Sequence, residues 1–175
     1  MRCDASVSGC DAGRMQTDIR DAMPGDADLL AQWAAAMALE TESKVLAPAT
    51  ILAGVHAGIA DPARARYFIA TGSAVFSGSE VVRLPVGTLM LTREWSDWRN
   101  GDWWWIQSVY VDPGYRRRGV LSALYRHVEK LARKTEGVIG LRLYVERDNA
   151  IAQRTYAALG MADAGYLIYE AGFGD

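Results

Sequence analysis

Apolar and polar positions follow two different periods along this chain, and these periods predict strands and helices in succession. Residues 141–146 read Leu-Arg-Leu-Tyr-Val-Glu, with the period of two that is typical of a half-buried strand. Residues 121, 124, 128 and 131 are apolar at the spacing of three and four that is typical of a helix. The complete pattern predicts strands at 17–20, 66–70, 81–92, 103–111, 139–146 and 166–170, and helices at 24–39, 50–60, 120–133 and 149–159.

This order of elements predicts an α/β (α+β) fold, a mixed sheet with helices against its faces. The length of 175 residues suits one domain with a substantial core, which we assign to residues 17–175. The first thirteen residues are rich in Ser, Gly, Asp and Ala and show no periodicity. We therefore expect residues 1–16 to form a disordered N-terminal extension.

Composition and charge exclude several classes of function. The net charge of -2 argues against a surface that coats nucleic acid, and no apolar run reaches transmembrane length. The two cysteines, Cys3 and Cys10, lie outside the predicted domain, so we do not expect a disulfide framework. We expect a cytoplasmic location. The two histidines, His56 and His127, are far apart and have no cysteine partners, so we expect no metal site.

A strand, a turn, three arginines and one glycine lead directly into the helix predicted to begin at residue 120. A helix N-terminus presents backbone N–H groups without intrahelical partners, and it favours negative charge. Glycine lets a phosphate approach the backbone, and arginine adds charge and forked donors. We predict a pyrophosphate-binding loop made by Arg116, Arg117, Arg118, Gly119, Val120, Leu121 and Ser122.

A second motif lies about thirty residues downstream of this loop. Asn149, Ala152, Tyr156, Gly160 and Met161 match the spacing N-x-x-A-x-x-x-Y-x-x-x-G-[FM], and residues 116–121 resemble the loop R-x-x-G-x-[GA]. Both motifs, in this order, are similar to those of the GNAT superfamily, the acyl-CoA-dependent N-acetyltransferases. The last loop position is Leu121 where the family has Gly or Ala. We expect Leu121 to point into the core with Leu124 and Val128.

The resemblance implies a GNAT-like sheet, mostly antiparallel, in which the strands at 103–111 and 139–146 splay apart to admit acetyl-CoA. It implies that backbone N–H groups of Val109, Tyr110 and Val111 polarise the thioester carbonyl. It also implies that Asn149 contacts the pantetheine arm and that Tyr156 binds the cofactor and protonates the leaving sulfur. The residues themselves favour a further role for Asn149 as a helix cap and leave a core role open for Tyr156.

The amine must lose a proton before it attacks, and carboxylates are the candidate bases. Glu94 is the first choice because its aromatic neighbours could raise its pKa, and Asp97 and Glu146 are the other candidates. The alternative for each is a solvated charge at the rim. Trp95, Asp97 and Trp98 are predicted to bind the acceptor amine, with cation–π contact from the two indoles, although part of the tryptophan cluster is expected to pack in the core.

These observations predict an enzyme that transfers an acetyl group from acetyl-CoA to the primary amine of a small molecule. The domain contains no cysteine that could carry the acyl group, which favours direct attack by the amine. Two alternatives stay open: a protein or peptide N-acetyltransferase, and a module that binds acyl-CoA without catalysis. We expect no nucleic-acid or membrane partner, and a homodimer is the assembly left open.

Overall fold

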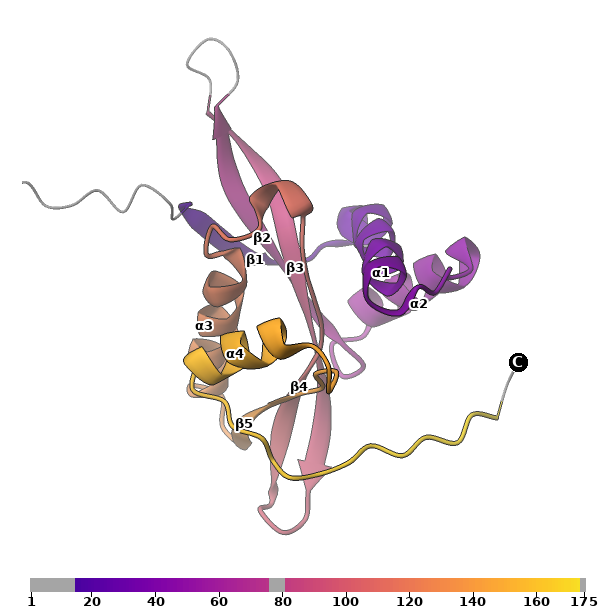
Figure 1. Ribbon diagram of the computed structural model, residues 1–175, viewed down its shortest axis with the longest axis vertical. Coiled ribbons are helices and arrows are strands. Elements are labelled where there is room, and N and C mark those ends of the chain that lie inside the picture. Colours follow the sequence, from indigo (N-terminus) through magenta and orange to yellow (C-terminus); the bar gives the residue numbers. More distant parts are fainter. Residues whose placement is uncertain (1–14, 76–80, 174–175) are drawn as a thin grey trace, which may run out of the picture. The chain divides into compact units, whose positions relative to one another are not determined.

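The computed structural model describes residues 15–75 and 81–173, and Figure 1 shows its ribbon. The chain divides into two compact units, Met1–Leu143 and Tyr144–Asp175. Among the described residues, the first unit holds the sheet and three α-helices, and the second holds one α-helix.

The sheet of the first unit has five strands in the order β1-β2-β3-β4-β5. The first three pairings are antiparallel, whereas β4 and β5 are parallel. The strands are β1 (Thr17–Asp21), β2 (Arg66–Val75), β3 (Val81–Ser96), β4 (Gly101–Val111) and β5 (Val138–Leu143). The predicted fold class, a mixed and mostly antiparallel sheet, is confirmed.

Helices cover both faces of this sheet, as predicted. On one face lie α1 (Ala27–Glu42) and α2 (Pro48–Ala60), and on the other lies α3 (Val120–Ala132) (Figure 1). The alternation of side chains along β2 divides the core in the same way. Ile69 packs in a cluster with residues of α1 and α2, whereas the ring of Phe68 lies 5.3 Å from His127 of α3.

The N-terminal turn of α3 follows the predicted loop directly. Gly119 precedes the helix with a φ of 84°, in the left-handed region where glycine has no steric penalty. Val120, Leu124 and Val128 are buried, and Leu121 is only half-buried. The apolar stripe of α3 therefore begins at Val120, one residue before the position that the sequence indicated.

A β-bulge divides β4 into two parts. Ser108 pairs with Met90 and Ile106 with Leu91, so Gln107 is the extra residue, and a bulge bends a strand and increases its twist. Pairing with β5 runs from Asp102 to Ile106 and stops there. We call Asp102–Ile106 the paired half of β4 and Gln107–Val111 its open half, because no described strand pairs with the open half on the side away from β3.

The second unit contains α4 (Ala150–Ala158). Asn149 caps this helix, since its side-chain oxygen accepts a hydrogen bond of 3.0 Å from the N–H of Ala152. The strand predicted at 166–170 is wrong: these residues have no regular secondary structure. A strand exists only through pairing, and among the described residues no strand follows β5. The apolar side chains of residues 166–169 are consequently 58–88% exposed.

Candidate active site

In the open half of β4, the N–H groups of alternate residues point away from β3, toward the open edge of the strand. Asp112 N–H donates to the carbonyl of Val86 at 3.0 Å, so the neighbouring pair of Val111 with Gly87 is one without mutual hydrogen bonds. By this alternation the N–H groups of Val111 and Val109 face the open edge, and that of Tyr110 faces β3. Two of the three predicted backbone donors can therefore act across the open edge.

The loop after β4 ends in a helix N-terminus without a side-chain cap. Asp112 begins the loop, and its carboxylate accepts from Gly114 N–H at 2.9 Å. The first intrahelical bond of α3 runs from Ala123 N–H to the carbonyl of Gly119. The N–H groups of the three residues before Ala123 thus precede the helical ladder, which is the arrangement that binds phosphate in proteins.

The first arginine of the loop is held on the side of α1. Arg116 donates from Nη2 to Glu40 at 2.6 Å and from Nε to the carbonyl of Val111 at 2.9 Å. Tyr110 donates its hydroxyl to the same Glu40 at 3.1 Å. The hydrogen bond from Arg116 lowers the pKa of Glu40, while burial raises the pKa of Tyr110. Glu40 was not among the residues that the sequence singled out.

The other two arginines of the loop have different surroundings. Arg118 lies over the ring of Tyr115 at 5.7 Å, and its carbonyl accepts a hydrogen bond of 3.1 Å from Met15 N–H. Arg117 has a φ of 63° and an exposed side chain. Residues 1–14 of the predicted N-terminal extension, with both cysteines, lie outside the described residues.

The first-choice base lies in the paired half of the sheet. Glu94 stands opposite Trp103 in the register, and its carboxylate accepts a hydrogen bond of 2.6 Å from Arg142. The guanidinium of Arg142 also lies 4.2 Å from the centre of the Trp103 ring. This bond engages Oε1 of Glu94, and the role of Glu94 as a base stays a prediction.

The residues predicted to bind the acceptor lie at the turn between β3 and β4. The side chains of Trp95 and Trp98 are 64% and 86% exposed, and Asp97 accepts from the N–H of Trp98 at 2.8 Å. This turn precedes β4, whereas the predicted cofactor loop follows it. A strand of 11 residues spans roughly 30 Å, so the turn and the loop lie at opposite ends of β4. Their role in acceptor binding also stays a prediction.

Three predicted residues belong to the second unit. Besides the cap made by Asn149, the carbonyl of Glu146 accepts a hydrogen bond of 3.0 Å from Gln153, and the side chain of Glu146 is exposed. Tyr156 is half-buried in the last turn of α4, and this burial raises its pKa. A tyrosine with a raised pKa is fully protonated at neutral pH, as a proton donor to a thiolate must be.

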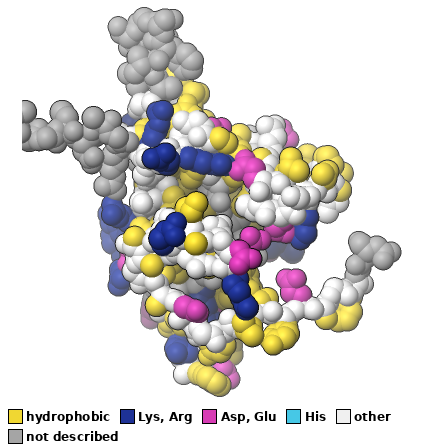
Figure 2. Space-filling model, viewed as in Figure 1, with side chains coloured by type: hydrophobic (Ala, Val, Ile, Leu, Met, Phe, Trp, Pro, Cys, Tyr) yellow, Lys and Arg dark blue, Asp and Glu magenta, His cyan; other side chains and the backbone are white. Residues whose placement is uncertain are grey.

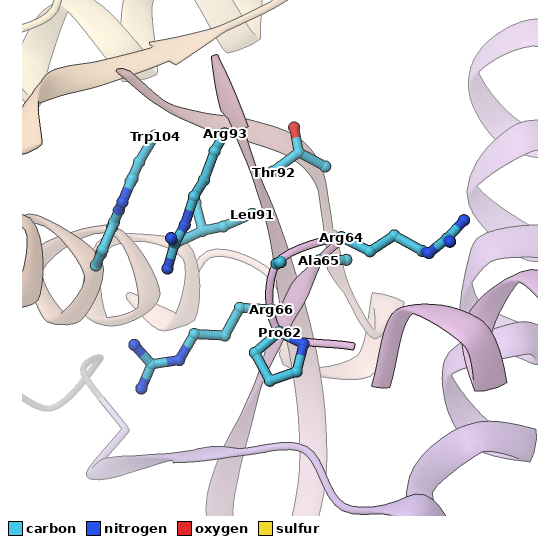
Figure 3. Close-up of a pocket in the computed structure, with 9 residues that line it drawn as sticks. Pro62, Arg64, Ala65, Arg66, Leu91, Thr92, Arg93 and Trp104 are labelled. Carbon is cyan, nitrogen blue, oxygen red and sulfur yellow. The ribbon is translucent and has the colours of Figure 1, made fainter. Parts of the chain in front are cut away.

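A shallow hollow lies elsewhere on the first unit, where β2 begins (Figure 3). Arg66 and Arg93 extend on the same side of it, next to the Trp104 ring, whereas Arg64 points away. Arg66 is paired with Asp21 at 2.7 Å. None of the loop residues lines this hollow, so it is separate from the open half of β4.

Charge is mixed on the face that Figure 2 displays. Basic and acidic side chains lie next to one another there, without one large area of a single sign. Within residues 15–75 and 81–173, none of the helices combines the length and apolar character that crossing a bilayer requires.

The chain matches one known protein family over most of its length. The model of the acetyltransferase (GNAT) family matches residues 30–161. The chain belongs to the GNAT family. The match includes the open half of β4, the loop with Gly119 and the whole of α4, so it covers both motifs that the sequence singled out. The family resemblance inferred from those motifs is confirmed.

Solved structures agree with this membership. A crystal structure described as a possible acetyltransferase from Clostridium difficile 630 is 37% identical, with a TM-score of 0.79, over 91% of this chain and 99% of that chain. An aminoglycoside N-acetyltransferase in complex with CoA is 16% identical, with a TM-score of 0.69, over 90% and 95% of the two chains. A ribosomal-protein-alanine N-acetyltransferase from Brucella melitensis is 18% identical, with a TM-score of 0.65, over 90% and 100%. No curated protein matches the chain.

The residues present fit a GNAT cofactor. The open half offers two N–H groups to a cofactor arm that lies along this edge of the strand. The uncapped start of α3 offers further N–H groups to the diphosphate. Gly119 has no Cβ where the backbone must be approached. Because GNAT proteins are acetyltransferases that use acetyl-CoA, this chain is an acetyltransferase by family, and its own donor and acceptor are matters for proposal.

Proposed function

We propose that this protein transfers an acetyl group from acetyl-CoA to the primary amine of a small molecule by direct attack. One observation carries the proposal: β4 loses its partner on one side at Ile106, continues with an open edge, and ends in a glycine loop at the uncapped N-terminus of α3. This arrangement matches the needs of a long ligand with an amide-bearing arm and a diphosphate.

The protein residues divide the work of the reaction among them. Acetyl-CoA supplies an activated acyl carbon and a thiolate leaving group. The N–H groups of Val109 and Val111 stabilise the negative charge that grows on the carbonyl oxygen. The loop residues hold the diphosphate, and Tyr156 gives its proton to the sulfur as the carbon–sulfur bond breaks.

The attacking amine must be neutral, because its lone pair forms the new carbon–nitrogen bond. Glu94 and Glu146 are the candidates to take the ammonium proton. Glu94 is held by Arg142, whereas the side chain of Glu146 is exposed. We therefore expect replacement of each residue by Gln to distinguish them: the variant without the base loses activity most strongly at low pH, where free amine is scarcest.

The acceptor is proposed to be a small amine. The net charge of -2 and the mixed charges of the surface favour a small cation over a polyanionic acceptor. The fold is shared, at under 25% identity, by one structure named for an aminoglycoside and by one named for a ribosomal protein. Because the second name indicates a protein acceptor, a peptide acceptor is the second candidate.

Release of free thiol from acetyl-CoA tests the proposal. The enzyme is incubated with acetyl-CoA and a panel of polyamines, aminoglycosides, amino acids and peptides that begin with different residues. Thiol release that requires a small amine supports the proposed acceptor class. Release with peptides alone would replace it by the peptide acceptor. Binding of acetyl-CoA without release by any panel member would favour the non-catalytic module.

A further inference from the structure

Glu40 links α1 to the predicted cofactor loop across 76 positions of sequence. One carboxylate oxygen accepts from Arg116 Nη2 at 2.6 Å, and the other accepts from the Tyr110 hydroxyl at 3.1 Å. Each partner comes from a different part of the site, since Tyr110 belongs to the open half of β4 and Arg116 to the loop. The last turns of α1 therefore contact both parts through one side chain.

This carboxylate is anchored from the buried side. Tyr110 is only 8% exposed, and its ring lies 6.1 Å from that of Trp33 in the core beneath α1. Its hydroxyl thus occupies a fixed place, and Glu40 is held by it although the Glu40 side chain is 40% exposed. Glu40 differs in this respect from Glu42, which is paired with Lys44 of its own segment.

Arg116 is in turn held at two points. Nε donates to the carbonyl of Val111 at 2.9 Å, and Nη2 donates to Glu40. Val111 is the last residue of the open half, and its peptide group faces the open edge. The guanidinium also lies 5.5 Å from the centre of the Tyr110 ring. Its remaining N–H donors have no further hydrogen-bond partner among the described residues, at the place where the open edge meets the loop.

We infer that Glu40 is a positioning residue for the cofactor: it fixes the guanidinium of Arg116 at the open edge of β4, so that its remaining donors meet a phosphate group. The inference rests on the proposed function. Holding a long side chain in its bound orientation removes part of the entropy cost of binding.

The negative charge of Glu40 repels the phosphates of the cofactor only weakly. Glu40 and Arg116 are about equally exposed, at 40% and 43%, so water and salt screen the repulsion between Glu40 and a phosphate. The hydrogen bonds that orient Arg116 act over 2.6 and 2.9 Å, well within one Debye length, so salt weakens them less than it weakens repulsion over a longer distance. Loss of Glu40 should therefore weaken cofactor binding rather than strengthen it.

Titration of CoA by calorimetry tests the inference with three variants of α1. We expect Glu40→Ala to weaken CoA binding about 10-fold and Glu40→Gln about 3-fold, because Gln keeps an acceptor oxygen but loses the charge-assisted bond. The matched control, Glu42→Gln, should bind CoA like the wild type. In turnover, the KM for acetyl-CoA should rise in the Glu40 variants while kcat stays within about 2-fold.

A double-mutant cycle with Arg116→Ala separates positioning from a general structural effect. If Glu40 acts through Arg116, then Glu40→Ala should weaken CoA binding by less than about 2-fold when Arg116 is already absent. An unchanged loss of about 10-fold in that background would overturn the inference. Arg116→Lys should behave like Arg116→Ala, because an ammonium cannot bind Val111 and Glu40 as a fork.

Further outcomes would also overturn it. Tighter CoA binding by both Glu40 variants would show that Glu40 competes with the cofactor for Arg116. Wild-type affinity in both variants, with wild-type CoA binding intact, would remove the inference and leave the proposed function standing. Absence of CoA binding by the wild type itself would remove both.

Discussion

The two halves of β4 differ in their hydrogen-bond partners. The paired half, Asp102–Ile106, is bonded on both sides and contributes Trp104 and Ile106 to the core, each 4% exposed. The open half is bonded only to β3 within the described chain, and it leads into the loop before α3. The difference begins at one residue, Gln107, where the bulge falls.

The contrast bears on the proposed site, which would use backbone groups of the sheet in place of a cavity of side chains. In the paired half, backbone hydrogen bonds go to neighbouring strands and side chains supply the packing energy. In the open half, the peptide groups of Val109 and Val111 remain for a ligand, and any residue type could provide them. Apart from Tyr110, which packs in the core, we expect the paired half to contribute more to stability, and we expect the open half with its loop to govern binding.

The largest expected effect is on stability, from the paired half. Trp104→Ala removes a buried ring and should cost about 3–5 kcal/mol in the free energy of unfolding, measured by urea denaturation. Val109→Ala, in the open half, removes a half-buried side chain and should cost about 1 kcal/mol. Equal losses in the two variants would contradict the division of β4.

The next effect is on chemistry alone. Tyr156→Phe removes the hydroxyl proposed to protonate the leaving sulfur and should lower kcat about 100-fold, while the Kd for CoA changes less than about 2-fold. Tyr166→Phe is the matched control, because Tyr166 belongs to the same unit and is 79% exposed. A Tyr156→Phe variant with the wild-type kcat would exclude this tyrosine as the acid.

Two glycines sharpen the comparison on the binding side. Gly119 and Gly137 have φ values of 84° and 77°, so Ala at either position should cost about 1–2 kcal/mol of stability. Gly119 lies in the loop after the open half, whereas Gly137 precedes β5 beside the paired half. Calorimetry should show about 10-fold weaker CoA binding for Gly119→Ala only. Equal weakening in both would mean that strain, and not the loop, controls binding.

The smallest effect concerns pH and the packing under α3. Burial lowers the pKa of His127 from its ordinary 6.5, while Asp21 raises it and Arg66 and Lys130 lower it further. The unfolded state therefore binds the proton more readily than the folded state. The contribution of neutral His127 to the free energy of unfolding is complete above pH 6.5 and is lost as the pH falls toward the lowered pKa of the folded state. Unfolding measured between about pH 7.5 and pH 5 should show a smaller decrease in His127→Gln than in the wild type.

The sequence predicts those parts of the fold that have a strong local period. The helix at 120–133 was expected from its apolar stripe, and the structure places α3 at Val120–Ala132. The cap by Asn149 and the uncapped start of α3 could also be predicted, because both depend on neighbours within a few residues.

Features that depend on contacts between residues far apart in the sequence could not be predicted from local periodicity. The bulge at Gln107 is set by register between β3 and β4, and no residue type marks it. The helix predicted at 24–39 stops before Glu40, whose partner Arg116 lies 76 positions away. The strand expected at 166–170 had the right residues, but strand formation requires a neighbour that periodicity does not identify.

The most direct test of the account is amide hydrogen exchange of the wild-type protein with and without CoA. We expect CoA to slow exchange at Val109 and Val111 and at the first N–H groups of α3, and to leave Trp103 to Trp105 of the paired half unchanged. This result would show that the ligand lies along the open half and reaches the helix N-terminus. Binding of CoA that leaves Val109 and Val111 unprotected, and protects the β3–β4 turn around Trp98 instead, would contradict the account.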